Sequence, residues 1–220
     1  MWQTFFSPLP LSIDNQKYPM NVNTYATEGD ISMTLGQKIC GFIEAYCSIS
    51  EGAQVGQPIK LKLFHDAKAP LANGHKRDSL LMMSDEEFES NHGFIQWAFP
   101  TAEKSDHNFN APVLDLDSAI WLAERNDVAE FLENMSVRFL EFLKWNNNWK
   151  SRYNHNHLRI SRAIDSLRLL HSWELADWLY VQVKAFAGQS MESMSDATVH
   201  WEAKASANHD RVACAFVGLD

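Results

Sequence analysis

Apolar residues recur at steps of three and four along most of the chain, which is the period of an amphipathic α-helix. The clearest case opens at Ser84, which forms a capping-box pattern with Glu87, and closes at Pro100. The pattern therefore predicts one helix over this segment. Its buried stripe is predicted to hold Phe88, His92, Ile95 and Phe99, with Gln96 on nearly the same face.

The same period predicts further helices, and strand signals are few. The predicted helical segments are 32–49, 120–125, 128–145, 158–170, 172–187 and 195–205. The strand candidates are KLKLFHD at 60–66 and the final apolar run. An Asn-rich cluster between Trp145 and Asn156 predicts a long polar loop, in which Asn154 or Asn156 caps the next helix. We expect a mainly α fold, a non-repeating helical bundle with few or no strands.

Three regions follow from these patterns. Residues 1–55 contain a lead-in rich in Pro and Asn and one helix. We interpret them as an N-terminal extension packed on the main domain, because one helix cannot bury its own apolar face. Residues 56–206 are expected to form the main helical domain, and residues 207–220 a C-terminal tail.

Composition and charge narrow the possible surroundings and partners. A chain of 220 residues with 45% hydrophobic content suits one sizeable domain, and its net charge of −9 disfavours nucleic acid and anionic lipid as partners. The N-terminus has no basic residue before Lys17 and fits no signal peptide. No apolar run approaches the roughly 18 residues of a membrane-spanning helix. With an odd number of cysteines, Cys40, Cys47 and Cys214, we expect a soluble cytoplasmic protein with free thiols.

Motifs of common cofactor and hydrolase chemistry are absent from the sequence. There is no phosphate-binding loop, GxGxxG, GxSxG, HExxH or CxxC pattern. His155 and His157 are separated by one residue, which does not place both rings on one helical face, so we expect no metal site and no cofactor. The carboxylates at Asp85, Glu86, Glu87 and Glu89 are explained by the first turn of a helix, where they stabilise its positive end.

Two segments place polar residues inside strongly apolar patterns. They are HGFIQWAFP at 92–100 and HNHLRISR at 155–162. Burying such polar groups costs several kcal/mol unless each finds a hydrogen-bond partner, so they are rarely incidental. The candidate binding residues are His92, Gln96, Trp97, His155, Asn156, Arg159 and Arg162.

The two segments resemble the conserved region of the opioid growth factor receptor family. In that family the first block reads roughly His, any residue, aromatic, Ile-Gln-Trp, any residue, Phe-Pro, and the second His-Asn, any residue, Leu-Arg-Ile, Thr or Ser, Arg. The resemblance extends over about 61–205 and includes the NFNAPVL stretch at 108–114. It implies an α-helical domain and a binding role, since animal members are described as receptors for a small opioid peptide. It makes His157 the variable position of the second block.

Several functional hypotheses remain open on the sequence. The first is a binding module in which the two motifs meet, either as a structural network or around a cleft for a peptide carboxylate, an anionic small molecule or a protein partner. The second is an enzyme with His92 or His155 as general base and Arg159 and Arg162 holding an anionic substrate. A nucleic-acid binder using the Arg-bearing helix is disfavoured by the acidic balance. In a structural network, Gln96→Leu and Arg159→Met should each lower thermal stability.

Overall fold

A computed structural model describes residues 57–206, and all regular secondary structure in this range is helical. The mainly α prediction is therefore confirmed. The predicted helix at 32–49, the three cysteines, both terminal regions and the C-terminal strand candidate lie outside the described residues. None of the helices described is long and apolar enough to cross a membrane. The elements are α2 (Gln57–His65), η2 (Asp78–Met82), α3 (Asp85–Ser90), α4 (Ile95–Ala98), α5 (Leu116–Ala123), α6 (Asn126–Trp145), η3 (Asn147–Lys150), α7 (Asn156–Leu170), α8 (Trp173–Ala187), η4 (Gly188–Met194) and α9 (Ser195–Ser206).

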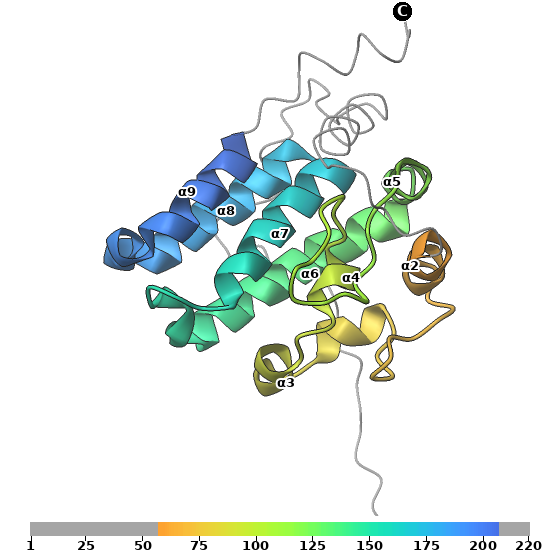
Figure 1. The fold of residues 1–220 in the computed structure, drawn as a ribbon, viewed down its shortest axis with the longest axis horizontal. Coiled ribbons are helices and arrows are strands. Elements are labelled where there is room, and N and C mark those ends of the chain that lie inside the picture. Colours follow the sequence, from red (N-terminus) through yellow and green to blue (C-terminus); the bar gives the residue numbers. More distant parts are fainter. Residues whose placement is uncertain (1–56, 207–220) are drawn as a thin grey trace, which may run out of the picture. The chain divides into compact units, whose positions relative to one another are not determined.

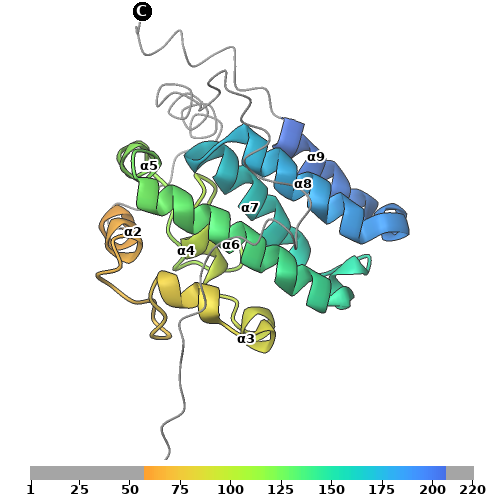
Figure 2. The same ribbon diagram turned by 180° about the vertical axis from the view of Figure 1, so that it is seen from behind.

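Helix α7 occupies the centre of the packing. It lies beside α8 and α9 in both views and also contacts α4, α5 and α6 (Figures 1 and 2). Its apolar stripe is fully buried, as its spacing predicts, because residues three and four apart share one face of a helix. The stripe consists of Ile160, Ala163, Ile164, Leu167 and Leu170.

Helix boundaries with a side-chain or glycine signal fall where the sequence places them. Ser172 caps α8 by accepting a hydrogen bond from the Leu175 N–H, and Gly188 ends it with a φ of 53°, a left-handed value that glycine adopts at low cost. The break between the predicted segments 120–125 and 128–145 corresponds to the boundary between α5 and α6. Trp201 anchors α9 as a fully buried residue.

The strand candidate at 60–66 is wrong, because this segment forms most of α2. Leu61 and Phe64 are buried and lie three residues apart, whereas Leu63 is 38% exposed. The polar and apolar alternation of KLKL therefore does not correspond to the side chains that are buried. Helix α2 contacts α5, Phe64 packs against Trp97, and this tertiary packing overrides the local alternation.

The single helix predicted from Ser84 to Pro100 is also wrong, since it is two short helices, α3 and α4. The capping box of Ser84 and Glu87 is present. However, α3 ends at Ser90, where Asn91 turns extended and its side-chain oxygen accepts a hydrogen bond from the Gly93 N–H at 3.0 Å. Asparagine competes for backbone groups in this way and interrupts the helical phase. His92 is consequently exposed and does not lie in the core as predicted.

The Asn-rich loop before α7 contains a buried anchor. Trp149 is fully buried within η3, and its indole N–H donates to the Leu143 carbonyl at 2.8 Å. The His157 ring donates from Nε2 to the Trp149 carbonyl at 2.6 Å, and the Trp201 indole donates to the His157 carbonyl at 3.0 Å. Asn154 prepares the start of α7 by accepting from the Asn156 N–H. His157 thus has a structural role here.

His65 is a fully buried histidine at the end of α2. Its Nε2–H donates to the Trp97 carbonyl at 2.9 Å, while Nδ1 is buried without a partner among the described residues. Burial lowers the pKa of His65 to about 3, because a charged imidazole would lose its hydration. The ring is therefore neutral in the folded protein.

His65 should make the stability of the protein fall as the pH falls below about 6.5. In that range the unfolded chain binds a proton at this residue and the folded protein does not, down to a pKa of about 3. The expected loss is on the order of 1.4 kcal/mol per pH unit from this residue alone. Urea unfolding at pH 7 and pH 5 should show a smaller difference for His65→Gln than for the parent. The exposed His200→Gln is the control, and an unchanged difference in His65→Gln would contradict this role.

Candidate functional site

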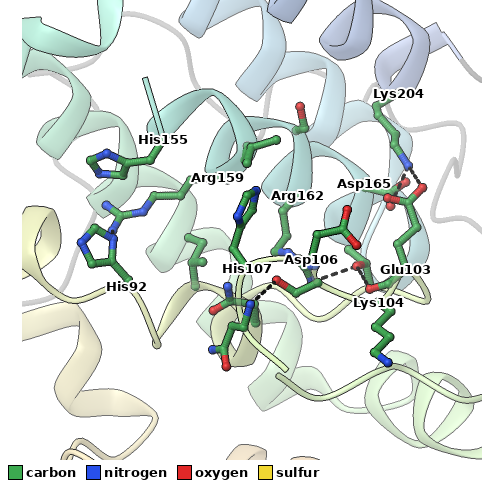
Figure 3. A pocket seen from close by; sticks show the side chains of 17 residues that line it. His92, Glu103, Lys104, Asp106, His107, His155, Arg159, Arg162, Asp165 and Lys204 are labelled. Carbon is green, nitrogen blue, oxygen red and sulfur yellow. Dashed lines mark hydrogen bonds and ion pairs between the residues drawn. The ribbon is translucent and has the colours of Figure 1, made fainter. Parts of the chain in front are cut away.

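The two polar motifs meet where α3 and α4 approach the start of α7 (Figure 3). Arg159 carries most of the contact and is only 4% exposed. Its guanidinium donates to the Phe88 carbonyl at 2.8 Å and the Asn91 carbonyl at 3.0 Å, with a longer contact of 3.4 Å to the Glu89 carbonyl. Nη2 also lies 3.4 Å from Nδ1 of His92, which accepts. The expectation that the motifs touch is confirmed.

Arg159 acts as the C-terminal cap of α3. The last carbonyls of a helix have no partner within the helix, and a buried helix end must find donors elsewhere. Arg159 supplies them from α7, and its planar fork also stacks over Phe94, with 5.6 Å to the ring centroid. Burial lowers the pKa of Arg159 to about 10, against the opposing effect of the Glu89 carboxylate, so it remains charged at neutral pH. Its position is structural.

Glu89 forms a second junction between the same elements. Its Oε2 accepts hydrogen bonds from the side-chain amides of Asn146 at 2.8 Å and Asn156 at 3.1 Å. His155 Nε2 lies 3.5 Å from the same oxygen. The interpretation of Glu89 as a first-turn residue of α3 is wrong, since the first-turn acids are Asp85, Glu86 and Glu87. Neither Glu89 nor Asn146 is recognisable from the sequence, because their pairing depends on α3 ending at Ser90.

His92 and His155 lie together at the surface. Their ring centroids are 5.1 Å apart in an edge-to-face arrangement, and both side chains are exposed. Partial burial and then the nearby Arg159 charge lower the pKa of His155, so this ring is a neutral base at physiological pH. Both histidines line the cavity described next.

A cavity of about 580 Å³ opens beside α7, between the two motifs and the loop that follows Pro100 (Figure 3). Among the candidate binding residues, His92, Gln96, His155, Arg159 and Arg162 line it, whereas Trp97 and Asn156 do not. Trp97 packs instead against Phe64, at 5.7 Å between ring centroids. Residues that sequence reasoning missed complete the lining, chiefly Thr101, Glu103, His107, Asp165 and Lys204.

Arg162 is the guanidinium that faces the cavity. Nη1 donates to the Thr101 hydroxyl at 2.9 Å, and no carboxylate of the described residues lies within ion-pair distance of it. Desolvation lowers the pKa of Arg162 and outweighs the opposite effect of Asp165 and Glu103. A partly desolvated cation without an ion pair is energetically unfavourable, because burial of a charge needs a counter-charge.

The carboxylates at the other end of the cavity already share a cation. Lys204 Nζ lies 2.5 Å from Glu103 and 3.1 Å from Asp165 (Figure 3). This cluster joins α9, α7 and the loop after Pro100. Burial raises the pKa of Asp165, against the charge of Lys204. Lys204 thus pairs with both carboxylates, and the three side chains together carry a formal charge of −1, which acts on Arg162 only from beyond ion-pair distance.

Gln96 contributes a polar group that the fold does not use. The side chain is 7% exposed, lines the cavity, and has its Oε1 buried without a partner among the described residues. The contrast with Arg159 is sharp, since that residue has several acceptors. Arg159 therefore belongs to a closed hydrogen-bonded network between the two motifs, whereas Gln96 and Arg162 line an open cavity.

Neither a metal site nor a relative identifies the cavity. No group of three or more His, Cys, Asp or Glu side chains within residues 57–206 could hold a metal ion. No family model, no curated protein and no solved structure matches the chain.

Replacing Arg159 by Met should destabilise the fold strongly. The substitution keeps the volume of the side chain and leaves the carbonyls of α3 buried without donors, at about 3 kcal/mol in total. The melting temperature should fall by roughly 6 to 12 °C. Arg152→Met is the matched control, because Arg152 is exposed and only lies over the Tyr153 ring among the described contacts. Equal melting of both variants would refute the capping role.

Gln96→Leu should behave in the opposite way. Its oxygen has no donor to lose, and an apolar side chain of similar volume removes a buried unsatisfied group. The free energy of unfolding should change by less than about 1 kcal/mol, or rise. Thermal and urea unfolding measure it, and a loss as large as that of Arg159→Met would place Gln96 inside the structural network.

Proposed function

We propose that the chain is a binding module and that the cavity beside α7 takes an anionic ligand, a peptide carboxylate or another anion. The observation that carries the proposal is Arg162. It offers five N–H donors, donates one of them to Thr101, and meets no ion-pair partner in the described part of the chain. A bound anion would supply a counter-charge in direct contact with the guanidinium.

The charge of the cavity supports an anion. Its lining has four basic side chains, Lys104, Arg159, Arg162 and Lys204, and three acidic ones, Glu103, Asp106 and Asp165. The formal charge is therefore +1 in a chain whose net charge is −9. A local positive site in an acidic protein attracts small anions without attracting extended polyanions such as nucleic acid.

The resemblance of the two motifs to the opioid growth factor receptor family supports the same class of function. Members of that family are described as receptors, and the motif residues that match it include Gln96, His155 and Arg162. We keep membership of that family as part of the proposal. It rests on the two motifs and the NFNAPVL stretch between them.

An enzyme is the second candidate, since His92 and His155 both line the cavity. In this alternative one of them is the general base and Arg162 holds the anionic substrate. Arg159 does not serve the substrate, because its donors already bind the carbonyls of α3. Hydrolysis of a 4-nitrophenyl ester that His155→Gln abolishes and His200→Gln retains would favour the enzyme. Equal rates in both variants would count against it.

Sodium acetate and sodium sulfate should bind at Arg162 in preference to sodium chloride at equal ionic strength. NMR spectra that follow the arginine side-chain Nε–H groups should show saturable shifts at Arg162 and at the Thr101 amide. Arg162→Gln should remove the shifts, and the exposed Arg152→Gln should retain them. Shifts no larger than those in chloride, or shifts scattered over the surface, would overturn the proposal, because they would show only general screening.

A further inference from the structure

We infer that the anion is a phosphate monoester and that Arg162 and Gln96 hold it. The inference rests on the binding function proposed above and specifies the chemical class of the ligand. It starts from the number of hydrogen-bond donors that the cavity offers and the fold leaves unused. Gln96 is buried and Arg162 half-buried, and both line the cavity.

The unused donors exceed what a carboxylate accepts. Four of the five N–H groups of Arg162 have no partner among the described residues, and the Gln96 side chain carries two amide N–H donors beside its unpartnered Oε1. One arginine fork satisfies the two oxygens of a carboxylate in a bidentate pair. The Gln96 amide would then remain without an acceptor. A phosphate monoester has three acceptor oxygens and can receive both side chains at once.

Other side chains of the lining can add donors for a further oxygen. His92, His107 and His155 lie in the same cavity, and an imidazole N–H is a hydrogen-bond donor (Figure 3). A phosphate monoester carries a charge of about −1.5 to −2 near neutral pH, because its second ionisation has a pKa of about 6. Lys204 holds Glu103 and Asp165 together at the far end of the cavity and compensates one of their two charges.

The remaining lining favours a small phosphate ester over a nucleotide. The apolar side chains of the described lining are Ile95 and Leu158, and the lining contains no Phe, Tyr or Trp. A nucleobase is usually held by stacking on an aromatic side chain. A phosphorylated side chain and a small phosphate ester share the chemistry that Arg162 and Gln96 would recognise.

The test compares two capped amino acids that differ in the anionic group. The probes are N-acetyl-O-phosphoserine methylamide and N-acetylglutamate methylamide, titrated at pH 7.5 with the Arg162 Nε–H signal and calorimetry as readouts. The phosphoserine probe should bind at least ten-fold more tightly. Arg162→Gln should abolish its binding and Gln96→Leu should weaken it several-fold, while Arg152→Gln should match the parent. Gln96→Leu is informative because its fold should be intact.

The possible results separate this inference from the proposed function. If the glutamate probe binds equally or more tightly and depends on Arg162, the phosphate assignment is wrong and the anion-binding function stands. If neither probe binds in a way that depends on Arg162, both fail. Phosphoserine binding that survives Arg162→Gln overturns the site.

Two further probes distinguish the source of the phosphate. Inorganic phosphate that binds as tightly as the capped phosphoserine supports a small phosphate compound. A nine-residue phosphoserine peptide that binds more tightly than the capped amino acid supports a phosphorylated protein segment.

Discussion

The packing of the first motif onto the second depends on one buried guanidinium. Helix α3 ends inside the protein, where the carbonyls of Phe88, Glu89 and Asn91 have no partner within the helix, and Arg159 supplies donors to them from α7. A lysine at this position could not replace the planar fork, because its single ammonium is a point donor. The short helices α3 and α4 therefore depend on an arginine far away in sequence for their position.

Arginines three residues apart on α7 have different roles. Positions i and i+3 lie on neighbouring parts of a helix face, so Arg159 and Arg162 repel each other unless each is compensated. The acceptors around Arg159 belong to the fold, and Thr101 alone accepts from Arg162 among the described residues. The sequence motif thus joins a structural residue and a residue free for a ligand, and the family resemblance does not separate them.

Local signals predicted much of the helical fold, and long-range contacts decided the rest. The α7 stripe, the Ser172 cap and the Gly188 end follow from spacing and capping chemistry, which act within one or two turns. The break at Asn91 comes from a side-chain hydrogen bond with the Gly93 N–H, which apolar spacing does not reveal. The helical state of α2 depends on which face finds a partner. The error at His92 follows directly from the missed break.

The candidate site was predictable only where its residues carry a local sequence signal. Gln96, His155 and Arg162 were found because polar residues in apolar patterns are conspicuous. Thr101, Glu103, His107, Asp165 and Lys204 were missed because they come from a loop and from helix positions with no unusual pattern. Trp97 matched the motif and yet points to α2, since the short α4 directs its neighbours to opposite sides.

The tryptophan contacts around the Asn-rich loop define how short the domain can be. The ring centroids of Trp149 in η3 and Trp201 in α9 lie 6.3 Å apart. Both residues form hydrogen bonds with His157 at the start of α7. A fragment that ends before α9 would expose the Trp149 ring to water and leave the carbonyl of His157 without its indole donor. The start of α7, which carries His155 and Arg159, would lose its support. The smallest unit that preserves the cavity therefore extends through Trp201, which does not line it, to Lys204, which does.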